Sequence, residues 1–220
     1  MKISDPSGSI LGEIQQIPYY FGLERLCILA SSNVEELLSL AAALYVGMQN
    51  KQVLRKPEVI LSPVEQERLL KEAARKKREF IPRNHTEGLR AQRLLDAMGS
   101  FCRERTFTPN APYAPGVTGV RLSRSELARL ENPSKSGTDK STLLVRVLAE
   151  CSAENLLLTR DSNASTSREG GTVFYLNRSL CVHYDLPLQQ GGWQDVSSTE
   201  LIEWMERGPM PGRRRRLELG

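Results

Sequence analysis

The sequence predicts a mainly helical α+β protein in which helices alternate with a few short strands. Apolar residues recur at helical spacing in several long segments. β-Branched and aromatic residues concentrate in two short stretches, 117–122 and 173–184. Clusters of Pro, Gly, Ser and Asn separate these segments, as loops and helix caps do.

The first helices are predicted between residues 20 and 49. Tyr20 to Ala30 forms a short helix, and Ser31-Ser32-Asn33 supplies good N-cap residues for the next one. Val34 to Gln49 is apolar around most of its circumference. A helix of that kind is expected to be buried between neighbours.

The clearest local signal is Ser62-Pro63-Val64-Glu65, a capping box with proline at the first helical position. This helix is expected to run to about Glu79 and to end because of Pro82. Asn84 or Thr86 starts the following helix, which carries apolar residues to Cys102. The two helices fit a helix-turn-helix or a plain helical hairpin.

The second half predicts shorter elements joined by shaped loops. Ser123 or Ser125 caps one helix, and Ser197 or Ser198 caps the last one. A turn at Asn177-Arg178-Ser179 would fold residues 173–184 into a hairpin, the wing of a winged helix. The other elements are an extended Pro-rich loop at 108–116, a strand at 117–122, a helix at 141–158, a loop tip at 161–171 and a loop at 191–193.

Several function classes find no support in the residues. No apolar run spans a membrane and no secretory leader opens the chain, so we expect a cytoplasmic location and no membrane partner. The four cysteines form no CxxC pair and are expected to be reduced and buried. Neither histidine lies at zinc-ligand spacing from a cysteine, so no metal is expected.

No catalytic motif is complete. Lys140-Ser141-Thr142 resembles part of a phosphate-binding loop, but the glycines that the loop needs are replaced by Asp139 and Ser134. The serines have no partner histidine at any argued geometry. We therefore expect no enzyme activity and no cofactor for this chain alone.

Positive charge gathers in one segment although the whole chain carries only +4. Residues 68–105 hold 11 Lys and Arg against 5 Asp and Glu, an excess of six. Such a concentration favours a polyanion, here the backbone of duplex DNA, although a solvated helix face is an equal alternative on composition alone. The candidate nucleic-acid contacts are Arg75, Lys76, Lys77, Arg78, Arg83, Arg90, Arg93 and, in the expected turn, Arg178.

The alternative function is a protein-interaction module without nucleic acid. Its partner surface would be the Pro-rich loop with Tyr113 and the Gly-Gly-Trp loop with Trp193. Tyr and Trp in shaped loops are typical interface anchors.

Four strings together resemble a known family: YYFGLERLCILASSNVEELLSLAAALY, LSPVEQERLLKEAARKKREFIPR, NAPYAPGVTGVRLS and FYLNRSLCVHYDLPLQQGGW. They are similar to the C-terminal half of bacterial AAA+ ATPases of the origin-recognition type, some of which occur in defence-like contexts. The resemblance implies a helical lid followed by winged-helix-like modules. ATP and Mg²⁺ would then belong to an ATPase core upstream, and the chain would be a fragment of that larger protein.

The resemblance implies four divisions of the chain. Residues 1–50 are the lid-like segment, 51–123 a winged-helix-like helical module with a short strand, and 124–210 a second module with a β-hairpin. Residues 211–220 are a basic tail, expected to be disordered. One motif departs from the family: its lids open the second helix with Gly-Asp-x-Arg, where this chain has Ser32-Asn33-Val34-Glu35. Glu35 cannot replace an arginine that reaches nucleotide phosphates.

Overall fold

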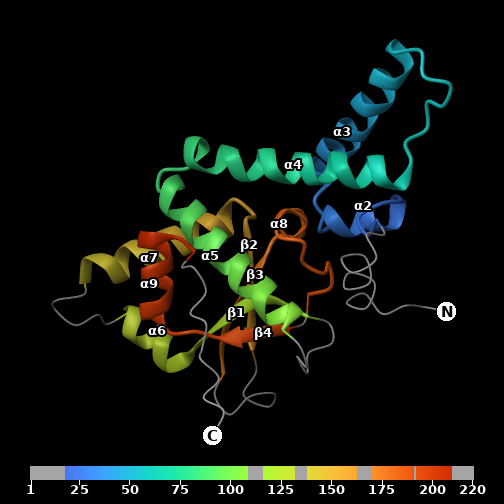
Figure 1. The fold of residues 1–220 in the computed structure, drawn as a ribbon. Coiled ribbons are helices and arrows are strands. Elements are labelled where there is room, and N and C mark those ends of the chain that lie inside the picture. The colour runs from blue at the N-terminus through green and yellow to red at the C-terminus, as the bar shows by residue number, and fades with distance from the viewer. Residues whose placement is uncertain (1–17, 109–115, 132–137, 163–169, 191, 210–220) are drawn as a thin grey trace, which may run out of the picture.

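A small mixed sheet and the helices packed on it form the body of the molecule (Figure 1). The structure is a computed structural model, and it describes residues 18–108, 116–131, 138–162, 170–190 and 192–209. Helices dominate these residues, which confirms the predicted mainly helical α+β class. The described helices include none with both the length and the apolar character that crossing a membrane requires.

The first helices are α2 (Leu23–Leu29) and α3 (Val34–Val53). Asn33 caps α3 by accepting a hydrogen bond from the Glu36 N–H, as the sequence predicts. The predicted burial of this helix is wrong. Only Leu40 and Gly47 are buried, while Leu38 and Tyr45 are 64% and 60% exposed. The reason is geometric: α3 contacts mainly α4, with a smaller contact to α2, and projects away from the body (Figure 1).

Helix α4 spans Pro63–Asn84 and begins with the predicted capping box. The Ser62 N–H donates to the Glu65 carboxylate, and this bond, together with the one from Lys51, lowers the pKa of that carboxyl to about 2. The predicted end at Glu79 is wrong, because the helix continues through Pro82. Proline has no N–H for the carbonyl of Arg78, four residues earlier. The side-chain amide of Gln92 donates to that carbonyl instead, at 3.2 Å.

Helix α5 (Gly88–Phe107) lies at the centre of the fold and contacts α4, α9 and the sheet. Its residues Leu94, Leu95 and Met98 are fully buried. They join the same core as Val120 and Leu122 of the central strand. A helix with so many buried positions is the element on which the others assemble.

The sheet has the strand order β2-β3-β1-β4, with β1 (Val117–Ser123), β2 (Leu157–Ser162), β3 (Gly171–Leu176) and β4 (Gly192–Asp195). Strand β3 pairs antiparallel with both β1 and β2, whereas β4 runs parallel to β1. The division that the sequence suggested between residues 123 and 124 thus separates β1 from the strands it pairs with.

Three helices complete the body: α6 (Arg124–Glu131), α7 (Thr138–Ala153) and α9 (Ser198–Arg207). Ser123 caps α6 and Ser197 caps α9, as predicted. The predicted helix over 141–158 is too long. Asn155 adopts a left-handed conformation, and the Leu156 N–H returns to the Cys151 carbonyl, which closes α7 and releases the chain into β2.

The predicted hairpin turn at 177–179 is also wrong. The Asn177 side chain accepts a hydrogen bond from the Ser179 N–H at 2.8 Å and starts helix α8 (Arg178–His183). The hairpin of this region is one strand earlier, between β2 and β3, with Ser162 opposite Gly171. The interior of the predicted 161–171 loop, residues 163–169, lies outside the described residues.

Candidate nucleic-acid interface

A pair of helices is followed along the chain by a hairpin that forms two strands of the sheet. The chain runs from β1 into α6, then α7, then the β2–β3 hairpin. Helix α6 contacts α7, β1 and α9. A pair of short helices with its second helix exposed is the architecture that helix-turn-helix proteins use in the major groove. We call α6, α7 and the described part of the β2–β3 hairpin the helix-pair surface.

Helix α6 is fixed to α9 through one carboxylate. Glu126 accepts hydrogen bonds from the N–H and the hydroxyl of Ser198, both at 2.6 Å. The Ser198 hydroxyl, together with the Ser198 N–H and Arg129, holds the pKa of Glu126 below its ordinary value. The bond also satisfies a free amide at the start of α9.

Helix α7 is fixed to the start of α5 by a second carboxylate. Glu150 accepts hydrogen bonds from the Thr86 and Glu87 N–H groups at 2.7 and 3.1 Å. On the adjacent face, Leu144 and Val147 are fully buried in the core. The orientation of α7 is therefore set by packing on one face and by a charged cap on its flank.

Three cations of the helix-pair surface are exposed, and each forms an ion pair at the protein surface. Arg129, Lys140 and Arg146 are 73%, 61% and 60% exposed. Their carboxylate partners are Glu126, Glu206 and Glu87, at 2.6, 3.1 and 3.3 Å. Exposed pairs of this kind contribute little to stability, so a phosphate can replace the carboxylate at small cost.

The hairpin adds a further exposed cation. Arg160 of β2 places its guanidinium 5.8 Å from the centre of the Tyr175 ring, and it donates to Gln190 at 3.4 Å. Arg160 is paired with Val173 of β3, so it belongs to the described part of the β2–β3 hairpin.

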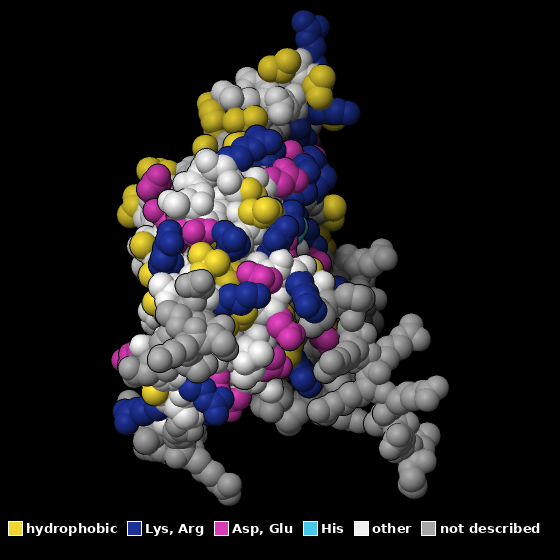
Figure 2. All heavy atoms as spheres, turned by 90° about the vertical axis from the view of Figure 1, so that its left-hand side faces the viewer, with side chains coloured by type: hydrophobic (Ala, Val, Ile, Leu, Met, Phe, Trp, Pro, Cys, Tyr) yellow, Lys and Arg dark blue, Asp and Glu magenta, His cyan; other side chains and the backbone are white. Residues whose placement is uncertain are grey.

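Two of the predicted DNA contacts adjoin this surface. Arg90 pairs with Glu87 at 2.7 Å, and the same carboxylate pairs with Arg146 of α7. Arg93 donates to the Glu206 backbone carbonyl at 3.0 Å, and the Glu206 carboxylate binds Lys140. Figure 2 shows this side of the molecule, with Lys and Arg side chains spaced among Asp and Glu.

The cations at 75–78 do not form one cluster. Consecutive helical residues point about 100° apart, and each of the four pairs with a different acid. Arg75 pairs with Glu79, Lys76 with Glu72, Lys77 with Glu36 and Arg78 with Asp96. Arg83 is exposed and pairs with none of the other described residues.

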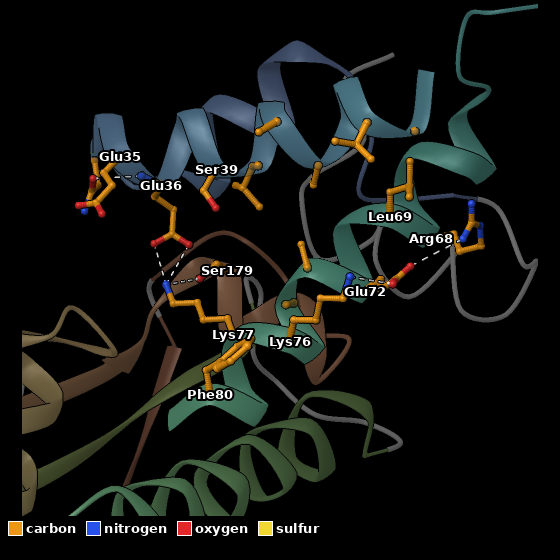
Figure 3. Close-up of a pocket in the computed structure, with 18 of the residues that line it drawn as sticks. Glu35, Glu36, Ser39, Arg68, Leu69, Glu72, Lys76, Lys77, Phe80 and Ser179 are labelled. Carbon is orange, nitrogen blue, oxygen red and sulfur yellow. Dashed lines mark hydrogen bonds and ion pairs between the residues drawn. The ribbon is translucent and has the colours of Figure 1, made fainter. Parts of the chain in front are cut away.

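Lys77 and Arg78 have structural partners. Lys77 donates to both oxygens of Glu36 and to the Ser179 hydroxyl, which joins α4 to α3 and α8 (Figure 3). Arg78 makes a two-pronged bond to Asp96, and the first cause of its raised pKa is that bond. These two side chains are only 28% and 29% exposed.

A groove of about 1160 Å³ runs between α3 and α4 beside Lys77. Figure 3 shows Glu36 and Ser39 on its α3 side and Leu69 and Phe80 on its α4 side. Its lining mixes apolar residues with acids and bases of both helices, so its charge favours no single sign of ligand.

The remaining predicted site residues are separated from each other. Arg178 donates to the Leu188 carbonyl at 2.9 Å at the start of α8, not from a wing. Trp193 is half-buried in β4, so it does not stand in a loop as predicted. Tyr113 and the interior of its Pro-rich loop lie outside the described residues.

Sequence reasoning missed the cations of the helix-pair surface because they form no run. Residues 124–162 hold six Lys and Arg and six Asp and Glu, so no local excess marks them. The usable signal was the order of elements: a strand, a capped short helix, a longer helix and a hairpin. The misplaced end of α7 and the misplaced hairpin concealed that order.

The cysteines and acids give no metal site in the described ranges, where no group of three or more His, Cys, Asp or Glu side chains is placed to hold an ion. Burial raises the pKa of the thiols of Cys151 and Cys181 to about 12 and that of Cys102 further. Cys27 is exposed, which corrects the prediction that all four are buried.

A family model described as ORC-CDC6-like matches residues 8–193. No curated protein matches the chain. No solved structure matches it either.

Proposed function

The chain belongs to the ORC-CDC6-like family, which relates it to AAA+ ATPases, and we propose that it is a non-catalytic module that binds duplex DNA through the helix-pair surface. The observation that carries the proposal is the exposed α7, second of two contacting helices and followed by a hairpin. In this assignment Gly88–Leu176 is a winged helix, with α7 in the major groove and the β2–β3 hairpin as its wing.

The cations around α7 support the assignment. Lys140 and Arg146 lie on α7, Arg129 lies on the contacting α6 and Arg160 on the following strand β2, and Arg90 shares the partner Glu87 with Arg146. They serve as phosphate contacts, which position the protein on DNA. This replaces the cluster at 75–78 as the leading interface, since Lys77 and Arg78 hold the helices together.

Titration of a labelled duplex against salt tests the proposal. We expect log affinity to fall linearly with log salt and the slope to lose about one unit when Arg146 is replaced by alanine. Arg75→Ala is the matched control, because Arg75 is also an exposed arginine in a surface ion pair, on α4. A slope near zero overturns DNA binding. If Arg75→Ala weakens the salt dependence of binding and Arg146→Ala does not, the interface lies on α4 instead.

The proposal assigns no chemistry to this chain, so ATP and Mg²⁺ would bind an AAA+ core. Within the proposed lid, Glu35 is exposed at the start of α3, where an arginine would be needed for a nucleotide phosphate. Calorimetry with MgATP tests this part, and a tight complex with the chain alone would contradict it.

A second candidate function is protein interaction, and the exposed face of α3 favours it. Val34, Leu38 and Tyr45 are each at least 60% exposed on a projecting helix. Large exposed apolar surfaces often mark protein contacts. A stoichiometric protein complex that is lost in Leu38→Ser, with DNA binding unchanged, would support this function.

A further inference from the structure

The outward face of α7 is almost uncharged. Leu144, Val147 and Leu148 face the core, and the opposite face exposes side chains of a different kind. These outward residues are Thr142, Val145, Arg146, Ala149 and Ala153. Val145 is 44% exposed although it lies in the middle of the helix.

Helix α4 differs from this face over the middle of its length. Its outward positions there carry Arg68, Glu72, Arg75 and Glu79, and its exposed apolar residues, Val64 and Phe80, lie towards its two ends. Water solvates such a face without loss. The α7 face presents methyl groups to water around one arginine, which is unfavourable unless a partner covers them.

The fold position of α7 identifies the partner. The second helix of a helix pair is the one that enters the major groove, and exposed cations lie around this helix. A protein partner would meet exposed cations beside a small apolar strip. DNA offers phosphates to these cations and base edges to the apolar strip. The arrangement of cations and apolar strip therefore fits duplex DNA better than a protein partner.

The chemistry of the strip selects among bases. In the major groove, thymine is the base that presents a methyl group, while cytosine and guanine present donors and acceptors that need polar partners. Val145 and Ala149 have no polar side-chain atoms, and Thr142 adds a methyl group one turn earlier. Thr142 and Ala149 lie two helical turns apart, roughly 10 Å, or about three base-pair steps of 3.4 Å.

We propose that α7 reads thymine methyl groups in the major groove through Val145 and Ala149, with Thr142 beside them. The proposal rests on the proposed DNA binding and adds a base preference to it. Arg146 lies on the same face and supplies the adjacent phosphate or guanine contact. The protein would then prefer duplexes with a short A·T run over duplexes of G·C alone.

Replacing thymine by uracil tests the proposal directly, because it removes the methyl group and keeps base pairing. The probes are a labelled duplex of alternating dA and dT and the same duplex with dU for every dT. We expect wild-type affinity to fall about fourfold for each methyl that loses a buried contact.

The variant Val145→Ala assigns the effect to a residue. We expect it to remove most of the discrimination between the two duplexes, because the two γ-methyl groups of Val145, the largest apolar side chain of the strip, are gone. Val53→Ala is the matched control, since Val53 is also an exposed helical valine, on α3. It should keep the wild-type discrimination. Thermal unfolding of both variants checks that the fold is intact.

The outcomes separate this proposal from the one it rests on. Equal binding of the two duplexes, with a salt dependence that Arg146→Ala weakens, overturns thymine recognition and leaves DNA binding intact. Discrimination that persists in Val145→Ala overturns the assignment to Val145. No salt-dependent binding to any duplex overturns both proposals.

Discussion

At the residue scale, Pro82 depends on a side chain of the next helix. The proline leaves the Arg78 carbonyl without its helical donor, and Gln92 supplies one at 3.2 Å. We expect Gln92→Leu to lower the free energy of unfolding by about 1 kcal/mol, because the carbonyl loses its hydrogen bond. Urea unfolding followed by circular dichroism measures it.

A double-mutant cycle identifies the cause. In a Pro82→Ala background the N–H of residue 82 can bond the Arg78 carbonyl, so Gln92→Leu should cost much less there. Equal costs in the two backgrounds would show that Gln92 contributes through packing and not through this hydrogen bond.

The same residues show where sequence reasoning stops. Local caps could be predicted because donor and acceptor lie within three residues, as at Ser62 and Glu65 or at Ser197 and Glu200. Rescue of Pro82 by Gln92 joins residues of two helices, and no local pattern marks it. The predicted end of α4 failed for that reason.

At the element scale, α5 carries a glycine that its packing requires. A Cβ at Gly99 would lie 2.4 to 2.5 Å from ring atoms of Tyr184. The ring cannot retreat easily, because its hydroxyl donates to Asp96 at 2.7 Å and Asp96 is held by Arg78. We expect Gly99→Ala to destabilise by about 1–3 kcal/mol, measured by thermal or urea unfolding.

Gly47 of α3 is the matched control. A Cβ there would approach Leu69 Cδ1, the end of a flexible side chain, and alanine is the better helix former. Gly47→Ala should leave stability unchanged or raise it. If both substitutions stabilise the protein, the Tyr184 ring can move away from Gly99 and does not require a glycine there.

The bond between α6 and α9 predicts an acid-sensitive element. The lowered pKa of Glu126 means that its stabilisation is complete above the unfolded pKa of about 4.3 and is lost as pH falls through the folded value. Glu126→Gln should therefore be less stable than wild type at pH 7, and the difference should shrink by pH 3.

Glu131→Gln gives the comparison for that measurement, because Glu131 is exposed on the same helix. We expect it to follow the wild-type profile at every pH. A stability difference for Glu126→Gln that is equal at pH 7 and pH 3 would contradict the role of the ionised carboxylate.

At the scale of the whole molecule, the fold class and the positions of the helices could be predicted from the sequence better than the way the helices pack together. The apolar pattern of 34–49 predicts a helix correctly, yet the burial of that helix depends on how many neighbours reach it, and α3 contacts mainly α4 and, less, α2. The candidate interface could not be read from charge for a related reason. Arg129, Arg146 and Arg160 belong to three successive elements of the helix-pair surface and form no run in the sequence, whereas the adjacent Lys77 and Arg78 point to different partners.

The projecting α3 predicts unequal stability within one molecule. Its attachments include the buried Leu40, the partly buried Leu37 and Leu44, and the ion pairs Glu36–Lys77 and Lys51–Glu65, whereas α5 is buried along most of its length. Helices with few buried contacts open locally before the whole protein unfolds. We expect amides of α3 to exchange with solvent deuterium well before those of Leu94 to Met98.

Leu40→Ala makes this expectation specific, because Leu40 is the buried apolar side chain of α3. Its truncation should speed exchange throughout α3 by weakening the contact with α4, and it should leave the slowest amides of α5 close to their wild-type rates. Hydrogen–deuterium exchange with mass spectrometry measures both helices at once. If the amides of α3 and α5 exchange at equal rates in the wild type, and Leu40→Ala changes both rates equally, the two helices open as one cooperative unit. Helix α3 is then an integral part of the core.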